Sequence, residues 1–152
     1  MRLAEALIER AEIQKLNAQL ISRIESNAKV QEGDEPSENP QNLLDEYKSN
    51  MERLLYLVQK INLTNSANSF DEKQTMSDAI ARRDSIKSQI KALRRITDEM
   101  QITQNRYSST EIRFVRCLDV KVIQVQIDNL SKQYRQIDTH LQELNWTTDL
   151  KE

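Results

Sequence analysis

Residues 120–144 read VKVIQVQIDNLSKQYRQIDTHLQEL, and this stretch decides the fold. Its apolar positions are separated by alternating steps of three and four residues: Val120, Ile123, Ile127, Leu130, Tyr134, Ile137, Leu141 and Leu144. This spacing places all of these side chains on one face of a long helix. A helix with a single apolar stripe needs a partner, so the chain should contain further long helices.

Three other segments carry related stripes. The segment 40–65 repeats the same steps at Leu44, Tyr47, Met51, Leu54, Val58 and Ile61. The segment 76–100 repeats them with one polar member at Ile86, Ile90, Leu93, Thr97 and Met100. The first helix is less regular, with Leu3, Leu7, Ile13, Leu16, Leu20 and Ile24. We predict an all-α single domain over 1–152, with helices at about 2–27, 40–65, 76–100 and 120–145.

The connections are marked by capping residues. The only glycine and both prolines lie in NAKVQEGDEPSENP, residues 27–40. Asn39 should cap the second helix, with Pro40 in its first turn, and Gly33 should supply a positive-φ turn. Thr75 and Asp119 are the expected caps of the third and fourth helices. Because the connections are short, we expect an elongated antiparallel bundle with coiled-coil-like packing and an irregular or short-strand segment at about 101–119.

The composition excludes several kinds of active site. One glycine cannot build a glycine-rich phosphate loop, and one histidine cannot supply a histidine-based di-iron centre. The single cysteine, Cys117, cannot form a disulfide within the chain, and we expect it to be a small core residue in a reducing compartment. The longest apolar run, residues 54–58, is far shorter than the roughly 20 residues that span a bilayer. We therefore expect a cytoplasmic, non-enzymatic protein without metal, cofactor or membrane span.

Charge is distributed unevenly along the chain, although the net charge is only −2. Residues 1–72 hold 8 basic and 13 acidic side chains, net −5, whereas residues 79–135 hold 12 basic and 6 acidic, net +6. The candidate binding residues of the positive half are Arg83, Lys87, Lys91, Arg94, Arg106, Tyr107, Glu111, Arg113 and Arg116. Such a surface is suited to phosphates and bases, or to the acidic half of the same bundle or of a neighbouring subunit.

Two further groups of polar residues have a functional and a structural interpretation. Asn62, Asn65 and Trp146 lie near helix ends, where they would line a ligand site or satisfy backbone groups and cover the core. Arg135 and His140 match the bare Arg-x4-6-His spacing of the all-helical HEPN ribonucleases. A solvated helix face is the alternative for this pair.

Six motifs in order resemble a family of short bacterial proteins of unknown function that are often labelled "septicolysin". They are LAEALIERAEIQK, NAKVQEGDEP, INLTNSA, SDAIARRD, RYSSTEIRFV and NWTTDL. The resemblance implies a small helical protein and supplies no catalytic residues. The chain departs from the family at Val122, where glutamate is frequent, which weakens the capping box that would follow Asp119. The label implies a cytolysin, but the residues show neither a secretion signal nor segments that would insert as membrane helices or barrel strands.

These observations favour a protein that self-associates or docks to a protein partner through its heptad faces and its 101–119 segment. Nucleic-acid binding by the basic face of the third helix is an alternative. A ribonuclease that uses Arg135 and His140 is a further one.

Overall fold

A computed structural model describes residues 1–102 and 112–151, which contain four helices. These are α1 (Leu3–Asn27), α2 (Pro40–Ala67), α3 (Met76–Glu99) and α4 (Val120–Thr147). The all-α class is confirmed, and the described ranges contain isolated β-bridges but no strand. The helix ends differ from the expected ones by at most two residues. The chain divides into two compact units, Met1–Ser77 with Gln142–Glu152, and Asp78–Leu141, so the single domain stays a prediction.

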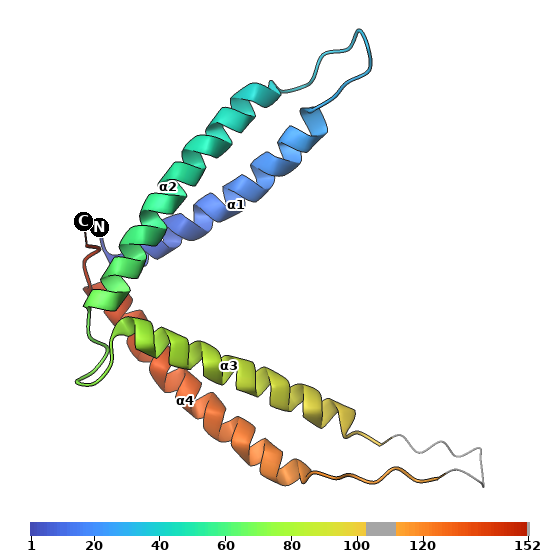
Figure 1. The fold of residues 1–152 in the computed structure, drawn as a ribbon, viewed down its shortest axis with the longest axis vertical. Helices are drawn as coiled ribbons and strands as arrows, with labels where there is room; N and C mark the ends of the chain where they lie inside the picture. The colour runs from blue at the N-terminus through green and yellow to red at the C-terminus, as the bar shows by residue number, and fades with distance from the viewer. Residues whose placement is uncertain (103–111, 152) are drawn as a thin grey trace. The chain divides into compact units, whose positions relative to one another are not determined.

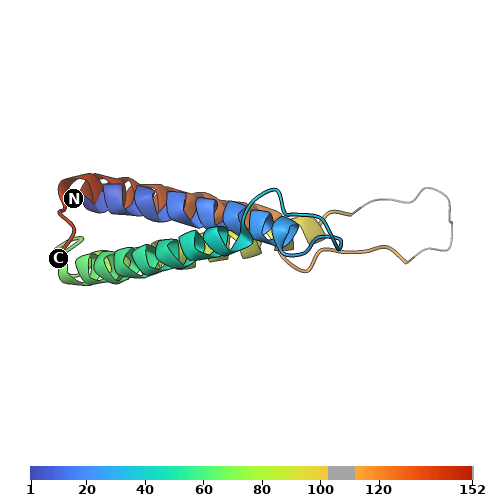
Figure 2. The same cartoon turned by 90° about the horizontal axis from the view of Figure 1, so that it is seen from above.

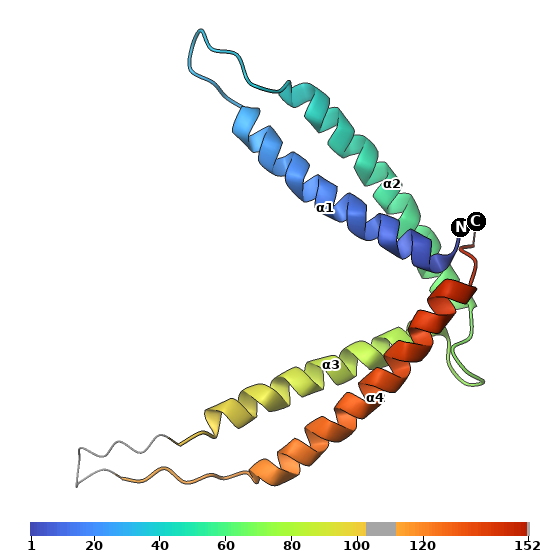
Figure 3. The ribbon, with the colours of Figure 1, turned by 180° about the vertical axis from the view of Figure 1, so that it is seen from behind.

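In the first unit, α1 and α2 lie side by side and antiparallel (Figures 1 and 3). On each helix, a series of buried and half-buried residues recurs at steps of three and four residues and forms one seam between the two helices. On α1 they are Leu3, Ala6, Arg10, Ile13, Asn17, Leu20, Ile24 and Asn27. On α2 they are Leu43, Tyr47, Asn50, Leu54, Leu57, Ile61, Thr64 and Asn68, the last at its C-cap.

The seam of α2 differs from the stripe that its apolar residues predict. Leu57 is fully buried, whereas Met51 is 41% exposed and lies beside the seam. The pattern misleads because the seam position Asn50 is polar, whereas Leu44, Met51 and Val58 beside the seam are apolar. The Asn50 amide donates to the Oδ1 atom of the buried Asn17 at 3.0 Å. A hydrogen-bonded asparagine pair at facing seam positions favours one register of the two helices over others.

Ion pairs close one side of this seam. The Nε and Nη2 atoms of Arg53 donate to the two carboxylate oxygens of Glu9 at 2.6 and 2.9 Å. Arg23 forms a similar two-pronged pair with Glu38. The hydrogen bonds from Arg53, followed by its charge, hold the pKa of Glu9 below its ordinary value of 4.5 despite some burial of the carboxylate. We call this side, with Glu9, Leu16, Arg23 and Arg53, the ion-paired flank.

Substitution of Glu9 by glutamine should remove a small, pH-dependent part of the stability. Because the pKa of Glu9 is lower in the folded state, its contribution is present above pH 4.5 and is lost as the pH falls through the folded pKa. Since both partners are partly exposed, we expect a loss of about 0.5 kcal/mol or less at pH 7. Urea unfolding at pH 7 and at about pH 3 measures the difference. Equal losses at both pH values, or the same behaviour in Glu12→Gln, which has no ion pair among the described residues, would argue against this ion pair.

The connection between α1 and α2 is fixed by the residues that its sequence marks. Gly33 has a φ of 90°, a conformation that favours glycine, and the Asp34 amide donates to the Gln31 carbonyl across this turn. The side chain of Asn39 accepts from the amides of Gln41 and Asn42 at 3.0 and 3.4 Å, and Pro40 opens α2. The expected turn and cap are therefore confirmed.

In the second unit, α3 and α4 also lie side by side and antiparallel (Figures 1 and 3). The α4 residues of the expected stripe are all buried or half-buried, and on α3 the seam continues from Ile86 back to Arg83 and Ala79. The Asp119 carboxylate accepts from the amides of Lys121 and Val122 at 2.9 and 3.4 Å and caps α4 as expected. The described parts of the 101–119 segment, 101–102 and 112–119, contain no strand.

Candidate interaction surfaces

The C-terminal tail and the N-terminus are joined by a set of hydrogen bonds that the sequence did not indicate. The Leu3 amide donates to the Thr148 carbonyl and the Leu150 amide to the Met1 carbonyl, both at 2.9 Å. The Lys151 amide donates to the hydroxyl of the fully buried Thr64 at 3.0 Å. The two chain ends therefore lie close together (Figures 1 and 2). We call residues 1–3 and 148–151, with Thr64, the terminal clasp.

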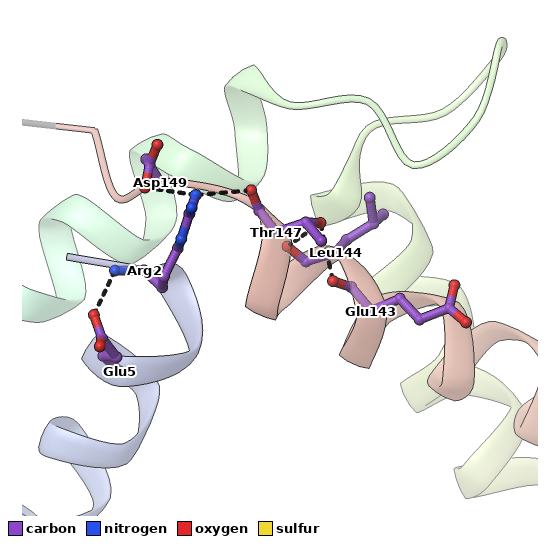
Figure 4. Close-up of polar contacts among 6 residues, drawn as sticks. All are labelled: Arg2, Glu5, Glu143, Leu144, Thr147 and Asp149. Atoms are coloured by element: carbon purple, nitrogen blue, oxygen red, sulfur yellow. Dashed lines mark hydrogen bonds and ion pairs between the residues drawn. The ribbon is translucent and has the colours of Figure 1, made fainter.

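Arg2 links the start of α1 to the end of α4 (Figure 4). Its Nη1 atom donates to the Thr147 carbonyl at 3.1 Å and to the Asp149 carboxylate at 2.8 Å. Its backbone amide donates to the Glu5 carboxylate at 2.7 Å. A guanidinium next to the last carbonyls of a helix also interacts favourably with the helix dipole. The arrangement is therefore structural, with the cation satisfied by backbone and carboxylate acceptors.

The polar residues near the helix ends differ in their exposure to solvent. Asn62 is exposed, and Trp146 is 56% exposed. Asn65 is buried, and its Oδ1 atom has no hydrogen-bond partner among the described residues. The neighbouring Thr64 donates to the Lys60 carbonyl at 2.7 Å and accepts from the tail. Thr64 therefore has a clearer structural role than Asn62, Asn65 or Trp146, although the sequence did not single it out.

Arg83, the first residue of the predicted basic stripe on α3, is paired within the hairpin. Arg83 lies in the α3–α4 seam and donates to Asp138 at 3.1 Å and to Asp84 at 3.0 Å. Burial opposes the charge of Arg83, but these two carboxylates outweigh it and raise the pKa of the guanidinium. Lys87, Lys91 and Arg94 are exposed and form no ion pair with a described residue. The predicted positive surface on α3 is therefore reduced to three side chains with Arg82 and Arg95 beside them.

The other predicted basic and aromatic residues follow α3. Arg113 and Arg116 are exposed, and the Nε atom of Arg116 donates to the Met100 carbonyl at 2.9 Å. The predicted Arg106, Tyr107 and Glu111 lie outside the described residues. Cys117 is exposed, so the expectation of a core position for it is wrong. The residue belongs to the irregular segment that precedes α4.

The pair Arg135 and His140 lies on α4 without sharing a face. Five residues of an α-helix correspond to a rotation of about 140°, so the two side chains leave the helix in well-separated directions. Arg135 is exposed and His140 is half-buried. The spacing that predicts a ribonuclease pair thus does not bring the two groups to one point on this helix. Among the described residues no cluster of three His, Cys, Asp or Glu side chains could hold a metal ion.

A shallow groove of about 460 Å³ runs along one side of the α3–α4 seam. Its lining carries no charged side chain and is formed by Gln89, Ala92, Leu93, Gln126, Asn129, Leu130 and Gln133. Amide side chains over a leucine floor bind polar or apolar surfaces without a preference for charge. This groove is absent from the sequence-based predictions because it depends on which amides meet across the seam.

The side of the α1–α2 seam opposite to the ion-paired flank is apolar. If the seam residues are labelled a and d in heptads, Glu9 and Arg53 fall at g and meet across one side. The e positions then lie on the other side, where α1 carries Leu7, Gln14 and Ile21, and α2 carries Leu44, Met51, Val58 and Asn65; Leu55 lies next to them at b. We call the apolar members of this set the apolar flank: Leu7, Ile21, Leu44, Met51, Leu55 and Val58. Ile21 is 43% exposed, Met51 41% and Leu55 59%.

The fold and these surfaces define a class of protein: an all-α protein of two helical hairpins, whose described residues expose apolar and charged surfaces. No helix of the described chain combines the length and the apolar character needed to cross a membrane.

Comparison with known proteins identifies the family to which the chain belongs. Residues 10–150 match the model of a family of unknown function (DUF6847), and the chain belongs to this family. It is also similar to a crystal structure of a functionally unknown conserved protein from Corynebacterium diphtheriae, with 40% identity, a TM-score of 0.90 and 99% of each chain covered. No match to a curated protein was found. The comparisons support membership in a family without an assigned function, and they do not confirm the "septicolysin" label.

Proposed function

We propose that the protein is a non-enzymatic, cytoplasmic interaction module that self-associates through the apolar flank of α1 and α2, with coiled-coil packing in each hairpin. The observation that carries this proposal is the unequal chemistry of the two sides of the α1–α2 seam. Arginine and glutamate pairs close one side, whereas Ile21, Met51 and Leu55 leave the other side apolar and half-exposed.

The heptad pattern supports burial by additional helices. A helix that packs against one partner needs apolar residues only at a and d, whereas apolar residues at a, d and e are typical of a helix in a larger bundle. Both α1 and α2 extend their seams in this way on the same side, with Gln14 and Asn65 as the polar exceptions. Two such hairpins that meet by their apolar flanks would form a four-helix arrangement.

A second copy of the chain fits this surface better than a charged partner does. The apolar flank contains no charged residue, so the same flank of another copy can face it without like-charge repulsion. An isologous pair would bury Met51 and Leu55 against their counterparts, and such burial stabilises by about 25 cal/mol per Å² of apolar surface. A second copy of the chain is therefore the partner that we propose for this surface.

Nucleic-acid binding remains the second candidate because Lys87, Lys91 and Arg94 are exposed and form no ion pair with a described residue. We place it second because Arg83 is held by two aspartates within the hairpin. Nucleic-acid binding would be recognised by an affinity for single-stranded nucleic acid that falls as salt is added, because release of counterions supplies much of the free energy of such binding.

Substitution of Leu55 by glutamate should weaken self-association at least tenfold, because it places a charge at the centre of a desolvated apolar contact. The variant should stay folded, since Leu55 is 59% exposed in the isolated chain. Light scattering over a concentration series measures the association, and circular dichroism checks the helices.

Leu16→Glu is the matched control. Leu16 is 49% exposed but lies on the ion-paired flank, so this variant should associate as the unmodified protein does. Equal effects of the two variants would contradict the assignment of the apolar flank. An unmodified protein that is monomeric throughout the series would contradict self-association itself.

A further inference from the structure

The segment that leads into α4 exposes an unusual amount of apolar surface. Residues 112–118 read IRFVRCL, and within them Ile112 is 94% exposed, Phe114 83% and Val115 79%. Leu118, at the end of the segment, is 56% exposed. Clusters of exposed large apolar side chains commonly mark a surface that another molecule covers. We call residues 112–118 the basic tip segment, because Arg113 and Arg116 alternate with the apolar side chains.

The connection between α1 and α2 offers opposite charge. Glu32, Asp34 and Glu35 are exposed and form no ion pair with a described residue, whereas Glu38 is already held by Arg23. The same connection exposes apolar surface at Val30, which is 48% exposed. The turn at Gly33 gives these carboxylates a defined backbone. We call residues 30–38 the acidic tip segment.

We propose that the basic tip segment of one copy docks on the acidic tip segment of a second copy. This inference rests on the proposed self-association and adds a second contact to the apolar flank, with the partner segment named. Arg113 and Arg116 would face Glu32, Asp34 and Glu35, while Phe114 and Val115 would be covered by the backbone and side chains around Val30. A two-fold pair would use this contact twice.

Charge complementarity selects a second copy of the chain as the occupant. The region of the basic tip segment, residues 79–135, has a net charge of +6, and the region of the acidic tip segment, residues 1–72, has a net charge of −5. Every copy therefore carries both halves of the contact. Exposed ion pairs contribute little affinity, so the apolar side chains supply the attraction and the charges supply partner choice and rate of encounter.

The native cysteine allows the contact to be tested in the full chain. Cys117 is exposed within the basic tip segment and is the only cysteine of the protein. A photoreactive maleimide on Cys117 should label residues 30–38 when the contact forms. In a mixture of ¹⁴N- and ¹⁵N-labelled protein, a cross-link between copies gives peptides of mixed isotope content. We expect mixed-isotope cross-links from Cys117 to residues 30–38.

Variants that reverse the charge of one tip segment at a time provide the matched control. The variants Arg113→Glu/Arg116→Glu and Glu32→Lys/Asp34→Lys/Glu35→Lys should each lower the yield of this cross-link about tenfold, since each places like charges together. A mixture of the two variants should restore it, because each acidic segment then meets a basic one. All five positions lie outside helices, so the helices should be unaffected.

Each alternative result overturns the proposal. Cross-links from Cys117 only to its own chain, only to Cys117 of another copy or to lipid or nucleic acid would do so, as would failure of the mixed variants to restore the yield. If the unmodified protein remains oligomeric in light scattering without the expected cross-link, the tip contact is wrong and self-association stands. If the protein is monomeric and no cross-link forms between copies, both proposals fail.

Discussion

Replacing Leu57 by alanine should lower the free energy of unfolding by about 3 kcal/mol, because it removes a fully buried side chain from the α1–α2 seam. A two-helix hairpin has few layers that could collapse into the resulting cavity, so the cost should be that of a true core position. Urea unfolding followed by circular dichroism at one fixed protein concentration measures the change.

The same experiment decides between two registers of α2. In the structure Leu57 is 0% exposed and Val58 is half-buried beside the seam, whereas the apolar stripe of the sequence assigns Val58 to the core and leaves Leu57 outside it. Leu63→Ala, at a position that is 47% exposed, is the control and should cost about 0.5 kcal/mol or less. A mild effect of Leu57→Ala together with a large effect of Val58→Ala would show that the stripe, and not the structure, gives the register.

Deletion of residues 148–152 should cost about 2–3 kcal/mol of stability, the second-largest effect that we expect. The deletion removes three hydrogen bonds of the terminal clasp, including the one that the buried Thr64 hydroxyl accepts. Each such bond contributes about 0.5–1.5 kcal/mol. Thermal unfolding of the shortened and full-length chains provides the comparison.

Asp149→Ala separates the backbone contacts of the clasp from its exposed ion pair. The Arg2 and Asp149 side chains are 48% and 76% exposed, so this substitution should change stability by only a few tenths of a kcal/mol. If Asp149→Ala were as damaging as the deletion, the ion pair would hold the clasp. If neither change had an effect, the tail would not be docked in solution.

Much of the fold could be predicted from the sequence because the helices are long and their caps are local. Asn39 and Asp119 mark helix starts through hydrogen bonds to amides two or three positions away, and Pro40 occupies the first turn of α2. The stripe of α4 is regular and apolar, so its seam was evident from spacing alone.

The seam of α2 could not be read in the same way. Its d positions include Asn50 and Thr64, and both are satisfied by partners that sequence spacing does not reveal: Asn17 on α1 and Lys151 in the tail. The spacing of apolar residues alone therefore assigned Met51 and Val58 to the seam. Their true place beside it is the source of the apolar flank on which the proposed function depends.

The candidate site residues illustrate the same limit. Arg83 belongs to the basic stripe by spacing, but its heptad position turns it into the α3–α4 seam toward Asp138. Arg113 and Arg116 were identified by charge, yet their significance changes once Ile112, Phe114 and Val115 prove to be exposed. Long-range pairing, which a single sequence does not encode locally, decides these cases.

The oligomeric state of the unmodified protein tests the central claim most directly. Sedimentation equilibrium over a concentration range up to about 100 μM covers the affinities expected of a specific contact between copies. We predict a weight-average mass that rises with concentration from 17.8 kDa to at least twice that value. A mass that stays at 17.8 kDa over the whole range would contradict self-association through the apolar flank.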